Sequence, residues 1–475
     1  MAQIDISASQ GTARMPRRAR SSGDQRVLNN IAAGLLLFLL ALSPLPFASV
    51  SPVMSAVWAC LLGLLGLGYF LLLVARGERL RFSLRRVGFP ALAIGMVLLW
   101  LVVQTLPVGE FSISLPNDAV KLESSTISIA PGLTLLMLGR QLTYGLFALL
   151  VLQVSVNDGR RAALLRITLC VVLAYALYGM IALHSGDTIL GQPKWAYLGA
   201  ATGPMVNRNS FATYLGIGAV LALAMIAARL IDQADRHKDD GRIANNTSTI
   251  TLLGLAYTFI LAVIISTQSR MGLAATLAGS AVVVLLTLAT LRNRRLSVGV
   301  ALGLFAIVAL GLVFFGQGLF DRLGSVESSS EVRSQLYQQT WELIMLRPWT
   351  GFGGGTFELA FPLVQHAPIS PDLVWERAHN TYLALWADLG LIAGSLPILA
   401  IAVIGWTLLR NVTVRRGSWR SQIAAIGVIV LGSVHSLSDF SLEIPAVTFL
   451  YIAVISIGLA GSKSALQSRA EATNA

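Results

Sequence analysis

Long runs of apolar residues separated by short polar joints dominate the chain. Each run approaches the roughly 20 residues that a helix needs to cross about 30 Å of hydrocarbon. A transmembrane barrel would instead alternate apolar and polar residues over segments of about ten. The pattern predicts an all-α polytopic membrane protein with about 12 transmembrane helices. We place these helices at residues 27–47, 53–75, 88–106, 133–155, 163–184, 208–229, 250–268, 272–291, 297–317, 380–408, 421–438 and 443–461.

The same pattern divides the chain into five parts. Residues 1–26 are rich in Arg, Ser and Gly and are expected to form a disordered cytoplasmic tail, with a second cytoplasmic tail at 462–475. The first nine helices fall within residues 27–317 and the last three within 380–461. Residues 318–379, the longest polar segment between helices, predict a large external loop. A loop of this length is usually functional or disordered, and its ordered-looking sequence favours function.

The charge of the chain follows the predicted topology. The net charge of +12 would suit a nucleic-acid partner if the basic residues formed one patch. Instead, all but nine of the 35 Lys and Arg residues fall in the tails and in alternate joints. This is the positive-inside pattern, and it predicts a multi-pass membrane protein with both termini cytoplasmic. A nucleic-acid partner is not expected, and the short cytoplasmic joints leave chemistry to the external face or to the membrane interior.

An amphipathic helix is predicted inside the long loop, in the stretch SSSEVRSQLYQQTWELIML. Ser330 is a plausible N-cap, and Arg347-Pro348 ends the helix because proline disfavours a helical residue before it. Val332, Leu336, Leu343 and Leu346 share one stripe, so the helix is expected to lie at the membrane surface. The following GFGGG is interpreted as a turn, since a lone glycine-rich run is weak evidence for phosphate binding.

The nine external basic residues need an explanation because topology disfavours them. Arg270 stands in a joint so short that it is held near the helix ends, where it either snorkels to lipid phosphate or binds an anionic ligand. Arg333 lies in a first helical turn, where a cation is unfavourable. Arg208 is flanked by asparagines that either bind sugar hydroxyls or cap a helix. The nine are Lys121, Arg140, Lys194, Arg208, Arg270, Arg322, Arg333, Arg347 and Arg377.

His379 lies between Arg377 and Asn380, directly before an apolar helix. Asp439, in HSLSDF, is close to the outer end of the eleventh helix. A single histidine is more often structural than catalytic, and spacing alone leaves both readings open. No His, Cys or acidic residues have the spacing of metal ligands, so neither a metal nor another cofactor is expected. The two cysteines are interpreted as small buried apolar residues.

Several segments, in the right order, resemble the O-antigen ligase and Wzy-type polymerase superfamily of bacterial envelope glycosyltransferases. The likeness covers residues of about 200–445, and the earlier helices match only as generic apolar spans. Its most specific part is R-P-x-x-G-x-G-x-G-x-F followed by H-N-x-x-L. The segments are VNRNSFATYLG, STQSRMG, EVRSQLYQQTWELIMLRPWTGFGGGTF, RAHNTYLALWADLGLIAG and VHSLSDF.

The resemblance implies a GT-C-like enzyme of the bacterial inner membrane that transfers a glycan from an undecaprenyl-pyrophosphate carrier to an acceptor hydroxyl. The transfer would occur at the periplasmic face, which makes the loop at 318–379 a periplasmic loop. The acceptor would be lipid A–core in a ligase, or the growing polysaccharide in a polymerase. His379 corresponds to the functional histidine, and Arg270 and Arg333 to the functional arginines, although SRMG stands here where SRG is expected. Arginines that bind pyrophosphate would allow metal-independent, inverting transfer. The further substrate-binding candidates are Arg208, Arg377, Asn380 and Asp439.

Two other classes of protein fit part of the pattern. A transporter of a polysaccharide precursor or small anion also has about twelve helices and short basic joints. Transporters, however, commonly place ionisable residues at the membrane midplane, and none of the predicted helices carries one near its centre. A structural scaffold is disfavoured only weakly by the external histidine and arginines.

Overall fold

The computed structural model describes residues 17–114, 121–236, 247–290, 326–370, 372–414 and 419–461. Helices dominate these ranges, with two small antiparallel hairpins, β1–β2 and β3–β4. The elements are α1 (Arg17–Leu42), α2 (Pro52–Ala75), α3 (Gly88–Thr105), β1 (Phe111–Ser114), β2 (Lys121–Ser124), α4 (Pro131–Val154), α5 (Asp158–His184), β3 (Thr188–Ile189), β4 (Gln192–Pro193), α6 (Arg208–Arg236), α7 (Thr247–Ser266), α8 (Arg270–Thr290), α11 (Val326–Leu346), α12 (Phe357–Ala360), α13 (Thr381–Thr413), α14 (Trp419–His435) and α15 (Pro445–Ala460).

The predicted class, an all-α polytopic membrane protein, is confirmed. Within the described ranges, nine helices are long and apolar enough to cross a membrane, and they correspond to the first eight predicted spans and the tenth. The predicted span at 297–317 lies outside the described residues. Large apolar side chains such as Leu64, Leu99 and Leu252 are exposed on the outside of the bundle. In water such a surface would be unfavourable, whereas lipid matches it.

Helix α6 forms the centre of one half of the bundle and packs against α5, α7, α8 and α14. Its middle is almost completely buried, and small residues allow its neighbours to approach closely. The same device joins α8 to α14, because a Cβ added at Gly279 would lie 2.6 Å from the Gly427 carbonyl oxygen. Close packing of this kind fixes the ends of α6, α8 and α14 relative to each other.

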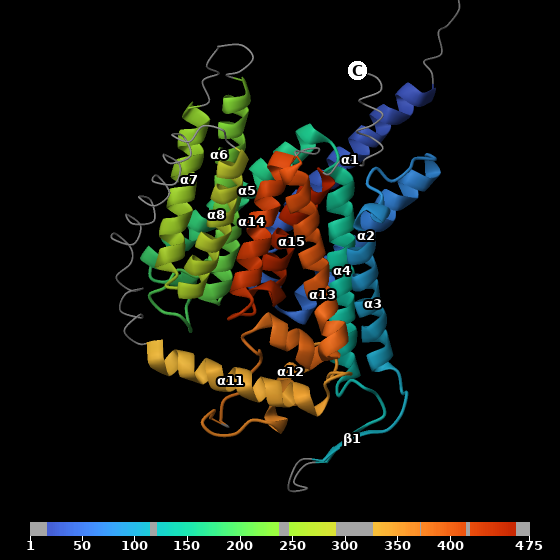
Figure 1. Ribbon diagram of the computed structural model, residues 1–475, viewed down its shortest axis with the longest axis vertical. Helices are drawn as coiled ribbons and strands as arrows, with labels where there is room; N and C mark the ends of the chain where they lie inside the picture. The colour runs from blue at the N-terminus through green and yellow to red at the C-terminus, as the bar shows by residue number, and fades with distance from the viewer. Residues whose placement is uncertain are drawn as a thin grey trace, which may run out of the picture.

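Helix α11 lies across one end of the bundle, roughly perpendicular to the long helices (Figure 1). The predicted amphipathic helix is therefore present, but it begins at Val326, so Ser330 is inside the helix and not its N-cap. Leu336 and Leu343 are fully buried, whereas Val332 and Leu346 are 45% and 40% exposed. The buried stripe is thus narrower than expected.

Helix α13 is broken at Gly390, which has φ +79°. The run at 380–408 looks continuous in sequence, but its first nine residues form a separate short helical segment beneath the bundle (Figure 1). A Cβ at position 390 would overlap the Trp349 carbonyl group, so only glycine fits there. The predicted uninterrupted helix over 380–408 is therefore corrected to two helical segments that meet at Gly390.

The GFGGG turn donates hydrogen bonds to backbone carbonyl groups that the break in α13 leaves without helical partners. The amide groups of Phe352 and Gly353 donate to the carbonyl groups of Ala387 and Asp388, at 2.9 Å and 3.0 Å. The Gly355 amide donates to the Asp388 carboxylate at 2.8 Å. An interrupted helix leaves peptide groups without partners, which is costly away from water. The glycines therefore have a structural role, as the interpretation of a turn predicts.

Helices α14 and α15 contain 17 and 16 residues. At 1.5 Å per residue they are about 25 Å long, shorter than the hydrocarbon core. Nearly all of their side chains are buried by the surrounding helices. The turn that connects them, residues 436–444, is therefore expected to lie within the depth of the membrane, on the side of α11 that faces the bundle.

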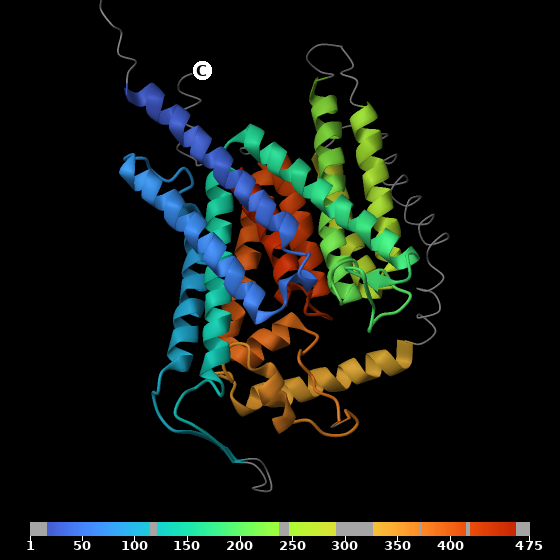
Figure 2. The same ribbon diagram turned by 180° about the vertical axis from the view of Figure 1, so that it is seen from behind.

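Both ends of the described chain lie at the same end of the bundle. Helix α1 starts at the end opposite α11, and the β1–β2 hairpin lies on the α11 side (Figures 1 and 2). The two cysteines, Cys60 and Cys170, are free and exposed on the outside of α2 and α5. The expectation that they are buried is wrong, because both helices lie at the periphery of the bundle.

Candidate functional site

Five segments that are distant in sequence meet at the α11 end of the bundle. They are the start of α6, the turn between α7 and α8, the helix α11, the residues just before α13, and the turn after α14. Apart from α11, each is a helix end or a turn, so backbone and side-chain polar groups that cannot be placed in hydrocarbon gather here. They surround one buried carboxylate.

That carboxylate is Asp439, whose side chain is 1% exposed. It accepts a short hydrogen bond from the Ser441 hydroxyl and a 3.4 Å bond from the Asn209 amide. The Nδ1 atom of His435 lies 3.7 Å from one carboxylate oxygen, and the Nδ1 atom of His379 lies 3.9 Å from the other. Asp439 is thus held between two imidazole rings, which stabilise its charge once either is protonated.

His379 is fixed from several sides. It has a left-handed backbone conformation, with φ +50°, and its carbonyl oxygen accepts a 2.9 Å hydrogen bond from the Tyr337 hydroxyl on α11. Its ring meets Phe440 and Trp375 edge-on, with centroids 4.9 Å and 6.1 Å apart. A strained conformation held by its surroundings is a common feature of functional positions. The ring is 26% exposed, so it borders the outside of the site.

The surroundings of His379 lower its pKa and so favour the neutral form of the ring. Burial lowers the pKa of His379 most, the Asp439 carboxylate opposes this by raising it, and the Arg333 guanidinium lowers it again. A neutral imidazole has a lone pair that can accept a proton. Arg333, on the first half of α11, is half-buried and within electrostatic reach of both site histidines.

Ser269 and Asn209 connect the Arg270 turn to the carboxylate. The Ser269 hydroxyl donates a 2.8 Å hydrogen bond to the Asn209 side chain, which in turn donates to Asp439. Arg270 is the first residue of α8, directly after Ser269. Arg208, directly before Asn209, stacks on the Tyr197 ring with its guanidinium 5.1 Å from the centroid. Arg208 thus directly precedes the residue that bonds to Asp439, and Arg270 directly follows the serine that bonds to that residue.

The neighbours of His379 are structural. Asn380 caps α13, because its side-chain oxygen accepts from the amides of Tyr382 and Leu383 at 3.0 Å and 3.1 Å. Arg377 forms an ion pair with Glu443 at 3.3 Å. Burial raises the pKa of Glu443, and Arg377 counters that effect. Both residues anchor the segment that carries His379 to the turn that carries Asp439.

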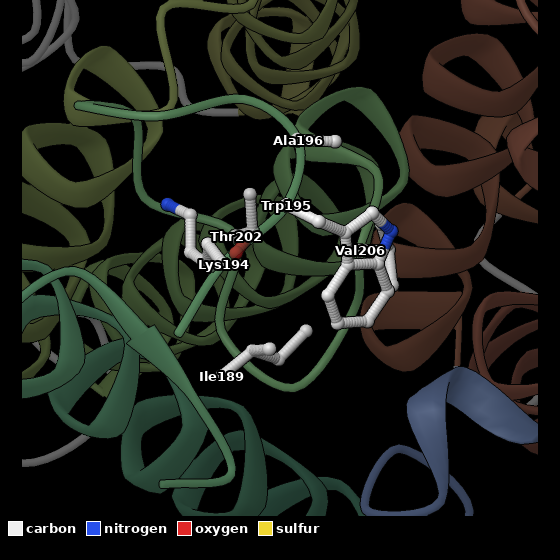
Figure 3. Close-up of a pocket in the computed structure, with 6 residues that line it drawn as sticks. All are labelled: Ile189, Lys194, Trp195, Ala196, Thr202 and Val206. Atoms are coloured by element: carbon white, nitrogen blue, oxygen red, sulfur yellow. The ribbon is translucent and has the colours of Figure 1, made fainter. Parts of the chain in front are cut away.

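Two of the other external cations are bound within the protein. Lys194 pairs with Asp187 and donates to the Ala200 carbonyl group at 2.6 Å. Figure 3 shows its amine pointing away from the Trp195 ring that lines the same hollow. Arg347 donates to the Ile127 carbonyl group at 2.9 Å, and burial lowers its pKa. Neither reaches the Asp439 cluster through a described contact.

Sequence reasoning missed His435 and did not settle the role of Asn209. His435 lies one helical turn before Asp439, at the end of an otherwise apolar helix, and is 1% exposed. Among the described residues, both of its ring nitrogens lack a hydrogen-bond partner. The i, i+4 spacing in VHSLSDF was the available signal. The role of Asn209 could not be read, because its partners come from two other parts of the chain.

In chemical terms, the site offers a proton acceptor beside a buried anion, with guanidinium groups around it. Among the residues that the structure describes, no group of three or more His, Cys, Asp and Glu side chains is arranged to hold a metal ion. An imidazole supported by a carboxylate can take a proton from a hydroxyl group. Guanidinium groups suit a ligand that carries phosphate.

Residues 255–398 match the family model for O-antigen ligase. No curated protein matches the chain. This match to part of the chain agrees with the predicted resemblance to the O-antigen ligase and polymerase superfamily and, together with the apolar helices, indicates a multi-pass, glycosyltransferase-like membrane enzyme. Arg270, Arg333, Arg377, His379 and Asn380 lie inside the matched segment, whereas Arg208 and Asp439 lie outside it.

Proposed function

We propose that this membrane enzyme of the O-antigen ligase and polymerase superfamily transfers a glycan from undecaprenyl-pyrophosphate to an acceptor hydroxyl at the periplasmic face. One observation carries the proposal. His379, within the segment that matches the family, directs Nδ1 toward the buried Asp439 carboxylate at 3.9 Å. The pair is a general base with its supporting anion, at the end of the bundle that carries the predicted external arginines.

His379 acts as the base in this proposal. In the tautomer with hydrogen on Nδ1, that N–H faces Asp439, and Nε2 is the nitrogen available to an incoming hydroxyl. The acceptor oxygen attacks the anomeric carbon while its proton passes to Nε2. The imidazolium that forms is stabilised by Asp439. Because burial keeps the pKa of His379 low, the ring is neutral and ready to accept before each transfer.

The arginines stabilise the leaving group. As the new bond forms, the bond between the anomeric carbon and the pyrophosphate oxygen breaks, and its electron pair leaves with the pyrophosphate. Arg270, Arg333 and Arg208 supply positive charge for that group without need of a metal. A single displacement inverts the configuration of the sugar. Asn380 and Arg377 support the site from behind by holding the His379 segment.

The distribution of charge supports the periplasmic face. The described basic residues that follow α2 and that begin α5 lie at the end opposite α11, which the positive-inside rule assigns to the cytoplasm. Helix α11 exposes Trp341 on a surface suited to the membrane interface. A lipid-linked pyrophosphate would then enter from the bilayer, on the side of α11 that faces the bundle. The proposed location is the bacterial inner membrane.

The test is reconstitution of the purified protein in lipid vesicles with an undecaprenyl-pyrophosphate-linked glycan, with and without a lipid A–core acceptor. Transfer to the core supports a ligase, and chain elongation alone supports a polymerase. Movement of the donor across the bilayer without any new glycosidic bond would contradict the proposal and indicate a transporter.

A further inference from the structure

A polar cavity lies at the end of the bundle opposite the candidate site. Its volume is about 520 Å³, and it lies between α5, α6 and α14. Arg161 and Arg166 come from the start of α5, Arg229 from the last turns of α6, and Arg420 from the start of α14. The volume falls within the range of small-molecule pockets, roughly 300–1,000 Å³.

The lining of the cavity carries excess positive charge. It contains four arginines and two aspartates, which gives a formal charge of +2. Arg161 is buried and pairs with Asp158, and Arg420 pairs with Asp232 at 2.9 Å. Among the described residues, Arg166 and Arg229 have no carboxylate partner. An anion with one or two negative charges would complete the charge balance.

Apart from Ser421, the rest of the lining is apolar. Leu165 of α5, Leu221 and Met225 of α6, and alanines of all three helices form the other wall. A basic region beside apolar groups matches the boundary between a phospholipid headgroup and its acyl chains. Arginines in this position bind phosphate while apolar side chains contact lipid tails.

We propose that this cavity binds the phosphate headgroup of an anionic phospholipid, with Arg166 and Arg229 as its principal cations. Arg161 and Arg420, fixed by their aspartates, form the sides of the headgroup site. In the orientation proposed above, the lipid belongs to the cytoplasmic leaflet. The site is distinct from the transfer centre, which lies at the other end of the same helices.

The shared helices give the lipid a structural role. Asn209 and Asp232 both belong to α6, 23 residues apart, which corresponds to about 35 Å along a helix. Helix α14 starts at the cavity and ends at His435. A lipid that joins α5, α6 and α14 at this end stabilises the pair of helices that positions Asn209 and His435.

Binding of lipid to the purified full-length protein in detergent, followed by native mass spectrometry, tests the proposal. We expect phosphatidylglycerol to bind about tenfold more tightly than phosphatidylcholine. In the double variant Arg166→Gln/Arg229→Gln, the affinity for phosphatidylglycerol should fall about 30-fold. Arg76→Gln, an exposed arginine at the same end outside the cavity, should bind as the wild type does.

A second variant separates loss of charge from loss of folding. Ala228→Trp keeps every arginine but fills the cavity, and it should also lose preferential binding of phosphatidylglycerol. Unfolding midpoints measured in phosphatidylcholine show whether each variant is folded. Equal affinity for the two lipids, or unchanged binding in the folded double variant, would overturn the proposal. Displacement of the lipid by equimolar inorganic phosphate or glycerol phosphate would identify a soluble anion instead, which also overturns it.

Discussion

Asp439 carries a carboxylate in an almost fully buried position, between His379 and His435. A buried charge is stable only with partners, and here they are a serine hydroxyl, an asparagine amide and two imidazoles. The two histidines differ in access, because His379 is partly exposed whereas His435 is closed off. In the proposed mechanism only His379 can meet a substrate, and His435 would act through Asp439.

Substitution of either of two charged neighbours of His379 should shift the pH dependence of transfer, and the two substitutions should shift it in opposite directions. The base must be neutral, so the rate should fall as the pH drops through the lowered pKa of His379. Arg333→Gln removes a cation that lowers this pKa, and the acid limb should move to higher pH. Asp439→Asn removes the anion that raises it, and the limb should move to lower pH, with a smaller maximal rate. The measurement is the initial rate of glycan transfer from about pH 4 to about pH 9, because this range covers the titration of histidine.

Shifts of the acid limb in the same direction for both variants would contradict this electrostatic account. Arg76→Gln is the control, since it removes one positive charge at the opposite end of the bundle. Its profile should coincide with that of the wild type, because screening at physiological salt acts over about 8 Å.

The sequence predicts individual residues of the site but not their contacts. Arg270, Arg333 and His379 are visible as polar residues in positions that topology disfavours. The family resemblance distinguishes them from the other external polar residues. The bonds among Ser269, Asn209 and Asp439 join segments 60 and 230 residues apart. Such contacts follow from how α6, α8 and α14 pack, and periodicity along one segment carries no information about them.

At the scale of elements, the broken helix α13 and the GFGGG turn form one unit. The glycine turn supplies amides to carbonyl groups that the break leaves free, and Trp100 and Gln104 of α3 complete the set by donating to Leu389 and Asp388. A turn was predicted for GFGGG, but its partner was not. Apart from Asp388, the residues around Gly390 are apolar, so hydropathy does not distinguish the break from a continuous span.

This unit predicts a specific loss of stability. Gly353 has φ +108°, and an added Cβ would lie 2.6 Å from the Ser128 Cβ. Gly353→Ala should therefore reduce the free energy of unfolding by about 1–3 kcal/mol. Gly139→Ala, in an open position on α4, should leave it unchanged or raise it. Titration with sodium dodecyl sulfate, followed by circular dichroism, measures both; equal losses would refute the role of the turn.

At the scale of the whole molecule, the bundle separates an arginine-rich end from the end that carries α11 and the candidate site (Figures 1 and 2). Hydropathy predicts the class of fold and most of the helices because lipid imposes one requirement on every span. It does not predict that α14 and α15 are too short to cross on their own, since their burial by neighbouring helices depends on tertiary packing.

The proposed orientation predicts which residues are accessible from outside. In a background with both native cysteines replaced by serine, Glu376→Cys is expected to react with a membrane-impermeant maleimide in intact spheroplasts. Both Glu376, next to the site, and Arg76, at the other end, are exposed. Arg76→Cys should react only after lysis. The reverse labelling pattern would place the site on the cytoplasmic side.

The most direct test of the central claim compares two histidines of the same polar segment. His379→Gln and His366→Gln each remove one imidazole and keep a polar side chain. His366 is exposed and pairs with Glu342 at 3.2 Å, away from Asp439. Both variants, at equal levels of folded protein, are assayed for glycan transfer in vesicles. The account predicts that His379→Gln lowers the rate about 100- to 10,000-fold and that His366→Gln leaves it near the wild-type value. A wild-type rate in His379→Gln would contradict the account.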